Sequence, residues 1–258
     1  MLGAIAGDII GSVYERHNIK RTDFPLFDPR CHFTDDTVLT VAVADAIMTG
    51  APYGQRLKEY YRYYPRSGYG AHFRRWAASD ETKPYYSMGN GSAMRVSPVG
   101  FAFDTLDEVL EEARKSAEVT HNHPEGIKGA QAVASAVFLA RTGRSKGEIR
   151  TYIEKTFEYD LREPLDEIRK YYRFDMTCPG SVPQAITAFL ESNDFEDAVR
   201  KAVSIGGDSD TVACMAGGMA QAFYGAVPEF IAREVKNHLD NRINAIVNQF
   251  MSQYCSVK

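Results

Sequence analysis

The first fourteen residues carry the pattern that most restricts how this chain folds. Residues 2–14 read as one helix that is apolar on nearly every face, which is typical of a helix buried on all sides. Gly3, Gly7 and Gly11 recur at every fourth position and form one stripe along that helix. Each glycine costs a helix about 1 kcal/mol relative to alanine, so the stripe needs a reason, and close approach of a neighbouring helix supplies one. The pattern predicts a buried helix that packs closely against a partner.

Small residues also fill the helical pattern at 211–224, which ends at Gly225. A third pattern at 36–48 is rich in alanine and valine and ends at Gly50. Helices of this kind near Asp8, Asp36 and Asp210 would let backbones approach at the short end of the usual axis separation of about 8–10 Å. Such packing could hold the acidic segments rigidly at a common end.

Helical patterns with start and stop signals fill most of the remaining chain. Thr105 with Glu108 and Ser145 with Glu148 are capping boxes, each opening a helix. The other expected helices are two short ones within 55–78 separated at Pro65, one opened by Asp194 at 195–204, and those at 124–142, 164–170, 182–191, 228–239 and 241–254. No alternation of period two, internal repeat or low-complexity linker stands out. We therefore expect an all-α fold, a single domain over residues 1–258 built as an orthogonal bundle of many helices.

The amino-acid composition limits the partners, the compartment and the membrane segments that we expect. The net charge of −4 gives no reason to expect nucleic acid or a membrane as a partner. The four cysteines show no paired spacing and read as reduced thiols in a cytoplasmic protein. No stretch approaches about 18 apolar residues, and no basic region precedes the first apolar run, so neither a transmembrane helix nor a signal peptide is expected. A monomer is the default expectation.

Two acidic segments, residues 33–37 and 206–211, are the main candidates for chemistry. Each places two carboxylates and a threonine hydroxyl just before a long helical pattern. This set of hard oxygen ligands suits Mg²⁺ or Mn²⁺ and suits Zn²⁺ badly. If the segments converge, four negative charges share one site and cannot all remain ionised without cations. The alternative is that both segments are ordinary helix N-caps.

Asp8 and Glu15 are the acids of the first helical pattern. They lie seven residues apart and so on one helix face, two turns from each other. Glu15 is expected either at the exposed edge or facing a polar site. Asp8 is a candidate structural hydrogen-bond acceptor.

Three further stretches have a structural and a functional interpretation. Gly89-Asn90-Gly91 is either a plain turn or a loop that presents N–H groups to an anion. His121 and His123 either begin a helix or bind a substrate ring or hydroxyl. The aromatic and arginine-rich stretch at 55–78 either packs inward or offers a surface that stacks on a ring.

Five motifs in order resemble the ADP-ribosylglycohydrolase family, over roughly residues 2–225. They are Gly7-Asp8-x-x-Gly11-x-x-x-Glu15, Phe33-Thr34-Asp35-Asp36-Thr37, Gly89-Asn90-Gly91-Ser92-Ala93-Met94-Arg95, Thr120-His121-Asn122-His123-Pro124 and Gly206-Gly207-Asp208-Ser209-Asp210-Thr211. Each motif alone is weak, but the ordered set is highly specific. The resemblance implies an all-α fold that carries two Mg²⁺ or Mn²⁺ ions between the acidic segments.

The same resemblance implies roles for individual residues. The implied metal ligands are Thr34, Asp35, Asp36, Asp208, Asp210 and Thr211. Glu15 is implicated in catalysis, and Asp36 and Asp210 are counted with it. The implied substrate-binding residues are Ser87, Met88, Gly89, Asn90, Gly91 and His121, to which we add His123. Some relatives carry an aromatic residue in place of Met88, so ring stacking is not expected from that position.

The expected activity is hydrolysis at C1″ of the distal ribose of an ADP-ribosylated protein or a small ADP-ribose conjugate. Two other hypotheses remain. One is a non-catalytic ADP-ribose-binding protein. The other is a Mg²⁺-dependent isoprenoid-diphosphate enzyme, which normally carries Asp-Asp-x-x-Asp, a spacing that neither acidic segment has.

Overall fold

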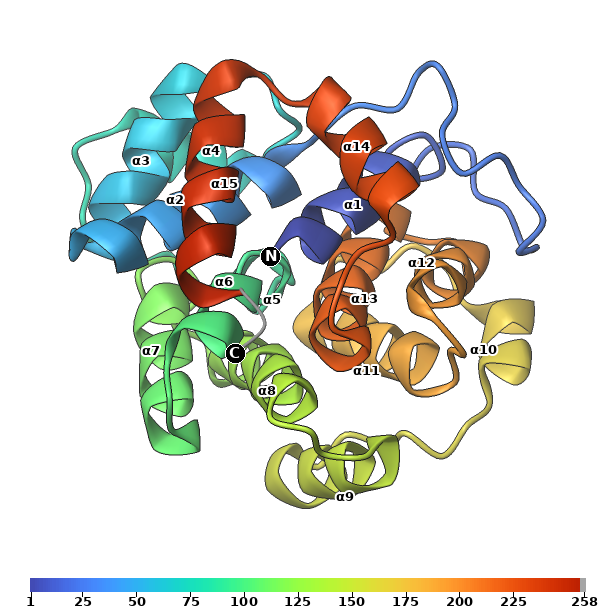
Figure 1. Cartoon of the computed structure of the whole chain (residues 1–258). Helices are drawn as coiled ribbons and strands as arrows, with labels where there is room; N and C mark the ends of the chain where they lie inside the picture. Colours follow the sequence, from blue (N-terminus) through green and yellow to red (C-terminus); the bar gives the residue numbers. More distant parts are fainter. Residues whose placement is uncertain (256–258) are drawn as a thin grey trace.

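The computed structural model describes residues 1–255, and helices account for most of them (Figure 1). In chain order they are α1 (Leu2–Gly11), α2 (Asp35–Thr49), α3 (Tyr53–Tyr63), α4 (Ala71–Ala78), α5 (Gly91–Met94), α6 (Ser97–Ala102), α7 (Leu106–Glu118), α8 (Pro124–Arg141), α9 (Lys146–Phe157), α10 (Leu165–Tyr171), α11 (Cys178–Leu190), α12 (Phe195–Ser204), α13 (Ser209–Tyr224), α14 (Glu229–His238) and α15 (Asn241–Tyr254).

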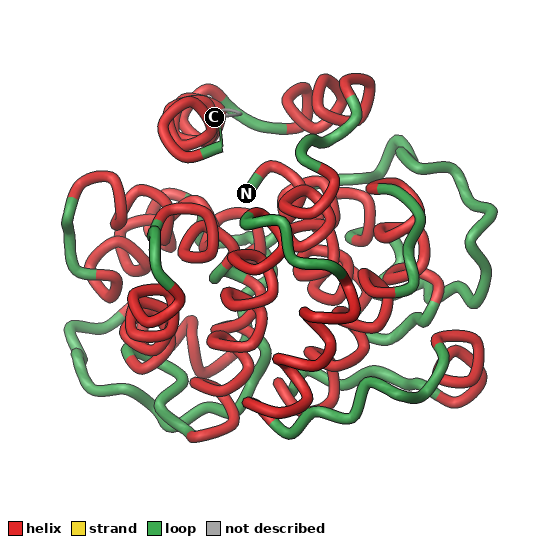
Figure 2. The backbone as a smooth tube through the Cα atoms, turned by 60° about the horizontal axis from the view of Figure 1, so that its bottom comes forward, coloured by secondary structure: helices red, strands yellow, loops and turns green. Residues whose placement is uncertain are grey.

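The expected all-α bundle is confirmed. Figure 2 shows helices joined by loops, with no strand among residues 1–255. The nearest approach to a sheet in that range is one isolated antiparallel bridge between Gly89 and Thr177. Buried apolar side chains from α1 to α15 form one contiguous core. The assignment of all 258 residues to a single domain stays a prediction.

The glycine stripe of α1 packs against α13, as the pattern indicates. A Cβ atom added to Gly3 would lie 2.3 Å from the Gly217 carbonyl oxygen. One added to Gly7 would lie 2.0 Å from the Ala213 carbonyl oxygen. Since these neighbours are backbone atoms, a side chain cannot fit without moving a helix. The two helices therefore meet backbone to backbone near the centre of the bundle (Figure 1).

Most helix boundaries agree with the start and stop signals. Both capping boxes are formed, at Thr105 with Glu108 and at Ser145 with Glu148. Gly50 and Gly225 end α2 and α13 in the left-handed conformation, with φ of 70° and 84°. Such φ values suit glycine because it has no Cβ to clash.

Three expectations about the backbone are wrong in detail. α1 ends at Gly11 rather than near Tyr14, so Glu15 lies in the following turn and shares no helix face with Asp8. α11 begins at Cys178 rather than Val182, because Thr177 caps it through the Gly180 N–H. The short helices α5 and α6 were not expected, since their few residues carry no full helical period.

The aromatic stretch at 55–78 packs mainly inward. Tyr60, Tyr69, Phe73 and Trp76 are buried, and a ring contact between Tyr61 and Phe73 joins α3 to α4. All four cysteines are free thiols. Among residues 1–255, no helix has both the length and the apolar character needed to cross a bilayer.

Candidate functional site

One large cavity of about 1200 Å³ opens beside the first turns of α2 and α13. Pockets for small ligands usually enclose about 300–1,000 Å³, so this cavity can hold a ligand of dinucleotide size. Its walls come from the turn after α1, the start of α2, the loop between α3 and α4, the segment before α5, and the start of α13. Segments far apart in the sequence therefore share one site.

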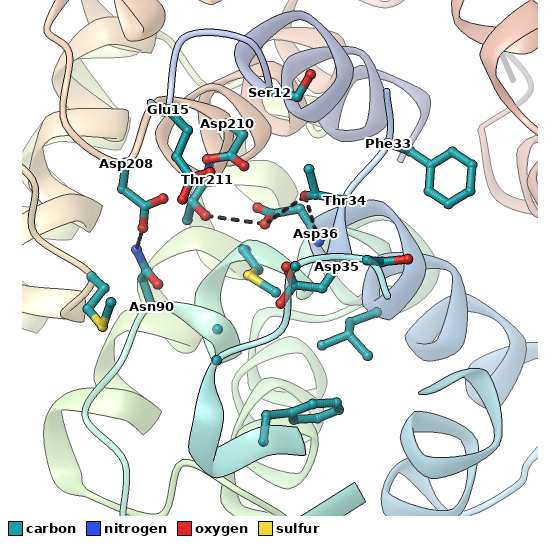
Figure 3. Close-up of a pocket in the computed structure, with 18 of the residues that line it drawn as sticks. Ser12, Glu15, Phe33, Thr34, Asp35, Asp36, Asn90, Asp208, Asp210 and Thr211 are labelled. Carbon is teal, nitrogen blue, oxygen red and sulfur yellow. Dashed lines mark hydrogen bonds between the residues drawn. The ribbon is translucent and has the colours of Figure 1, made fainter. Parts of the chain in front are cut away.

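An acidic cluster, by which we mean Asp8, Glu15, Asp36, Asp208 and Asp210, lies at this cavity. All of these residues except the fully buried Asp8 line it. One carboxylate oxygen from each of Asp8, Asp36 and Asp210 lies within 4.8 Å of the others. The same holds for Glu15, Asp208 and Asp210. Asp210 belongs to both groups, so the cluster has two adjoining halves. Figure 3 shows Asp210 and Thr211 of α13 pointing toward Asp36 of α2, with Glu15 beside them.

Asp8 is the most fully bonded member of the acidic cluster. Its carboxylate accepts from the Thr34 N–H at 2.9 Å and the Thr34 hydroxyl at 2.6 Å. It also accepts from the Thr37 N–H at 3.0 Å and the Thr37 hydroxyl at 2.5 Å. Asp8 thus ties α1 to the start of α2, which is the structural role expected for it. Close packing of the helices near Asp8, Asp36 and Asp210 was expected, but Asp8 was not counted among the candidate metal ligands.

Thr34 serves as the N-cap of α2, accepting from the Asp36 N–H at 3.3 Å. The helix-cap interpretation of this segment is therefore correct for Thr34. It does not exclude a functional site, since Asp36 from the same turn enters the cluster. At the second segment Asp208 occupies the N-cap position of α13 without a side-chain cap bond.

Asp36 carries an unsatisfied oxygen. Its Oδ2 accepts from the Thr211 hydroxyl at 3.2 Å, while its buried Oδ1 has no hydrogen-bond partner. Burial raises the pKa of Asp36 well above its usual value, and the charges of Asp8, Asp35 and Asp208 raise it further. A buried, unpartnered carboxylate oxygen is costly unless a cation or proton meets it.

The pKa values of Asp35, Asp208 and Asp210 are raised as well. Burial, then the Asp208 and Asp36 charges, raise the pKa of Asp210 well above its usual value. Burial raises the pKa of Asp208 to about 6. Asp35 lines the cavity at the start of α2, and burial followed by the Asp8 charge raises its pKa. These carboxylates repel one another and favour any bound positive charge.

The donor set fits a divalent cation. The two cluster halves offer only carboxylate oxygens, with the Thr211 hydroxyl beside Asp36. No histidine or cysteine belongs to either half among residues 1–255. Hard oxygen ligands of this type suit Mg²⁺ or Mn²⁺. The buried acids could therefore hold a metal ion.

A glycine loop, residues 87–91, forms the wall next to the acidic cluster. The Asn90 side chain donates from Nδ2 to Asp208 Oδ2 at 2.7 Å, which joins the loop to the cluster (Figure 3). The Asn90 N–H donates to the Met176 carbonyl at 2.8 Å, and the Gly89 N–H to the Ser87 hydroxyl at 3.0 Å. The loop is thus held in place by the protein alone.

The structure separates the expected substrate-binding residues into two groups. Ser87, Gly89, Asn90, Gly91 and His121 all line the cavity. Met88 and His123 do not line it. The Met88 side chain is exposed, and His123 caps α8 by accepting from the Glu125 N–H at 3.1 Å. For His123 the helix-start interpretation therefore describes the geometry. The roles of all these residues stay predictions.

Several cavity residues were not expected. Arg16, Arg66 and Arg95 bring positive charge to its walls, and Tyr85 and Phe174 bring rings. Arg95 belongs to the Gly89–Arg95 motif, and this was the one sequence signal that could have placed it at the cavity. The others lie in loops whose path no local pattern determines.

Three comparisons relate the chain to known proteins. The family model described as ADP-ribosylglycohydrolase matches residues 1–257. ADP-ribosylhydrolase ARH3 of Mus musculus is 27% identical over 313 residues, covering 89% of this chain and 84% of the relative. ADP-ribosylarginine hydrolase Tri1 of Pseudomonas putida (strain GB-1) is 26% identical over 268 residues, covering 90% of this chain and 72% of the relative. A solved structure titled ADP-ribosylglycohydrolase-related protein complex shares the fold, with a TM-score of 0.72 over 98% of this chain and 96% of that chain at 24% identity.

Proposed function

Because this chain belongs to the ADP-ribosylglycohydrolase family, and is thus a glycosidase of that class, we propose that it removes ADP-ribose from modified side chains with the help of two Mg²⁺ or Mn²⁺ ions. The bond cut is the N- or O-glycosidic bond at C1″ of the distal ribose. The single observation that carries this proposal is the acidic cluster, most of which lines a cavity of about 1200 Å³. Family membership also sets aside the isoprenoid-diphosphate hypothesis.

The two halves of the acidic cluster are the proposed metal sites. Asp36, Asp208 and Asp210 would hold the ions, and Thr34, Asp35 and Thr211 would complete the ligand set. Asp210 is common to both halves, which supports its role as the shared ligand. The unpartnered Asp36 Oδ1 supports a cation on that side. When bound, the ions orient the 2″- and 3″-hydroxyls of the ribose and ready a water for attack.

Side chains of the protein supply proton transfer, orientation of the water and stabilisation of charge. Glu15 sits in the turn after α1 and lines the cavity beside Asp208 and Asp210. We assign it to proton transfer or to orienting the water. As the bond to the acceptor breaks, C1″ gains oxocarbenium character, and the surrounding carboxylates stabilise that positive charge. Holding water and ribose in register lowers the entropic part of the barrier.

The glycine loop and His121 hold the other half of the substrate. Gly89 and Gly91 leave the backbone open to the cavity, so the Gly91 N–H at the start of α5 can approach a diphosphate, while the Gly89 N–H is donated to the Ser87 hydroxyl. His121 stands next to the loop with Nε2 toward Gly91. The proposed partners are therefore ADP-ribosylated proteins or small ADP-ribose conjugates, with the ADP-ribose half bound by this wall.

The test is direct hydrolysis. The protein is incubated with arginine-linked, serine-linked and nucleotide-linked ADP-ribose, with and without chelator, and released ADP-ribose is measured by chromatography. We expect release from at least one conjugate, loss of release with chelator, and recovery with Mg²⁺ or Mn²⁺. Tight binding of ADP-ribose by titration calorimetry without release from any conjugate would support the non-catalytic hypothesis instead.

A further inference from the structure

Arg95 is a buried cation to which the proposed chemistry gives no role. Its side chain is fully buried just after α5, against the cavity wall. Nη2 donates to the Ser116 carbonyl at 2.7 Å and to the Thr120 hydroxyl at 2.9 Å. Among residues 1–255 no carboxylate pairs with it, and Nε and Nη1 have no partner. Burial lowers the pKa of Arg95 to about 10, so it remains charged at neutral pH.

The Thr120 hydroxyl connects Arg95 to His121. Its Oγ1 lies 2.7 Å from His121 Nδ1. A guanidinium can only donate, so Thr120 Oγ1 must be the acceptor in the contact with Arg95. The hydroxyl hydrogen is then free to be donated to Nδ1. The Tyr85 phenol also contacts Thr120, and this contact offsets part of the rise that burial causes in the pKa of Tyr85. A phenol can donate or accept, so Tyr85 competes with His121 Nδ1 for the Thr120 hydrogen unless the phenol is the donor.

The opposite nitrogen of the His121 ring faces the glycine loop. A Cβ atom added to Gly91 would lie 3.1 Å from Nε2, and one added to Gly89 would lie 3.5 Å away. The backbone of His121 is fixed as well, since its N–H donates to the Ala117 carbonyl at 2.7 Å. Burial and the Arg95 charge lower the pKa of His121 well below its usual value, so one ring nitrogen carries no hydrogen at neutral pH.

From these contacts we infer that Arg95 and Thr120 are positioning residues that keep the ring hydrogen of His121 on Nε2, where it is donated into the cavity beside Gly91. The chain of donors runs from Arg95 to Thr120, from Thr120 to Nδ1, and from Nε2–H to the ligand. A neutral imidazole with its hydrogen on Nε2 donates a hydrogen bond to an anionic or hydroxyl oxygen of the ligand. It adds no positive charge to that of Arg95. That this oxygen belongs to the diphosphate or ribose of ADP-ribose rests on the proposed function.

The experiment compares Thr120→Val with Thr120→Ser. Valine keeps the shape of threonine but loses the hydroxyl, whereas serine keeps it. The His121 tautomer is read from ¹⁵N chemical shifts of the ring, assigned with His121→Gln, and ADP-ribose affinity is measured by calorimetry in Mg²⁺ buffer. We expect hydrogen on Nε2 in the wild type and in Thr120→Ser, a mixture of tautomers in Thr120→Val, and about tenfold weaker ADP-ribose binding by that variant.

The outcomes separate this inference from the proposed function. Hydrogen on Nδ1 in the wild type, or an unchanged ring spectrum in Thr120→Val, overturns the inference whatever the enzyme's activity. An Nε2–H ring in a protein that neither binds nor releases ADP-ribose upholds the inference and overturns the proposed function. Thr142→Val is the matched control, because it removes a helix-end hydroxyl outside the cavity and a purely structural loss would not change the tautomer.

Discussion

The acidic cluster and the glycine loop border the same cavity but reach their geometry in opposite ways. In the glycine loop, the contacts of Ser87 and Asn90 are satisfied by the protein itself. In the acidic cluster, burial and mutual repulsion raise the pKa values of Asp36 and Asp210, and Asp36 Oδ1 has no partner. These contacts of the loop are satisfied without a ligand, whereas the repulsion within the cluster favours added positive charge.

This difference indicates which region limits activity and which limits stability. Changes in the acidic cluster should impair catalysis while relieving repulsion in the metal-free protein. Changes around the glycine loop should weaken binding with little gain in stability. The following predictions test this comparison, from the largest expected effect to the smallest.

Asp210→Ala should have the largest effect. It removes the carboxylate shared by both halves of the cluster, so kcat should fall by at least about a thousandfold. Thermal unfolding in chelator should show the metal-free variant to be more stable than the wild type, since one repelling charge is gone. Near-normal turnover would remove the metal role from this residue. Asp45→Asn, which alters a buried aspartate outside the cavity, is the control.

Gly7→Ala should destabilise the protein by about 3 kcal/mol or more. The new methyl group would lie 2.0 Å from the Ala213 backbone, so α1 and α13 must separate. Urea unfolding measures the loss. Gly147→Ala is a suitable control, because no atom lies within 4 Å of a Cβ at that helical position. Equal stability of the two variants would contradict the backbone contact.

The stability of the metal-free protein should depend on pH in a defined direction. Burial raises the pKa of Asp208 from 3.8 to about 6. The stabilisation from its protonated form is therefore complete below about pH 4 and is lost as the pH rises through about 6. Asp36 and Asp210 act with the same sign. In chelator the melting temperature should fall as the pH rises over this range, and millimolar Mg²⁺ should reverse the fall. A melting temperature that rises instead would contradict the repulsion.

Substitutions of His121 and His123 should have the smallest effects of this series, and the two should affect different properties. His121→Ala should weaken ADP-ribose binding about tenfold, because the ring faces the glycine loop. His123→Ala should leave binding unchanged and cost about 1 kcal/mol of stability, because it removes the N-cap of α8. Calorimetry and urea unfolding measure the two effects. Weakened binding by His123→Ala would restore the sequence-based assignment.

Local patterns were sufficient to predict most helices. Capping boxes and terminal glycines act over a few residues, so Thr105, Ser145 and Gly225 could be interpreted without tertiary information. The end of α1 was missed because it depends on distant contacts. The Asn18 side chain binds both the Tyr14 carbonyl and the Gly207 carbonyl, which turns the chain away from the helix.

The candidate site was predictable only in part for the same reason. The two acidic segments stood out by their composition, and the structure brings Asp36 and Asp210 together. The entry of Asp8 into the cluster and the Arg95–Thr120 contact depend on side-chain packing across helices. No spacing rule along the chain contains that information.

The contact between α1 and α13 also has a consequence for how the protein is made. The Gly3 N–H bonds Gln221 across 218 positions of sequence, and the acids beside this contact come from both ends of that interval. During synthesis α1 leaves the ribosome with an apolar surface on nearly every side. It cannot pack against α13 until most of the chain has been made. The apolar surface of α1 is therefore exposed to aggregation during synthesis, and the acidic cluster can assemble only near the end of translation.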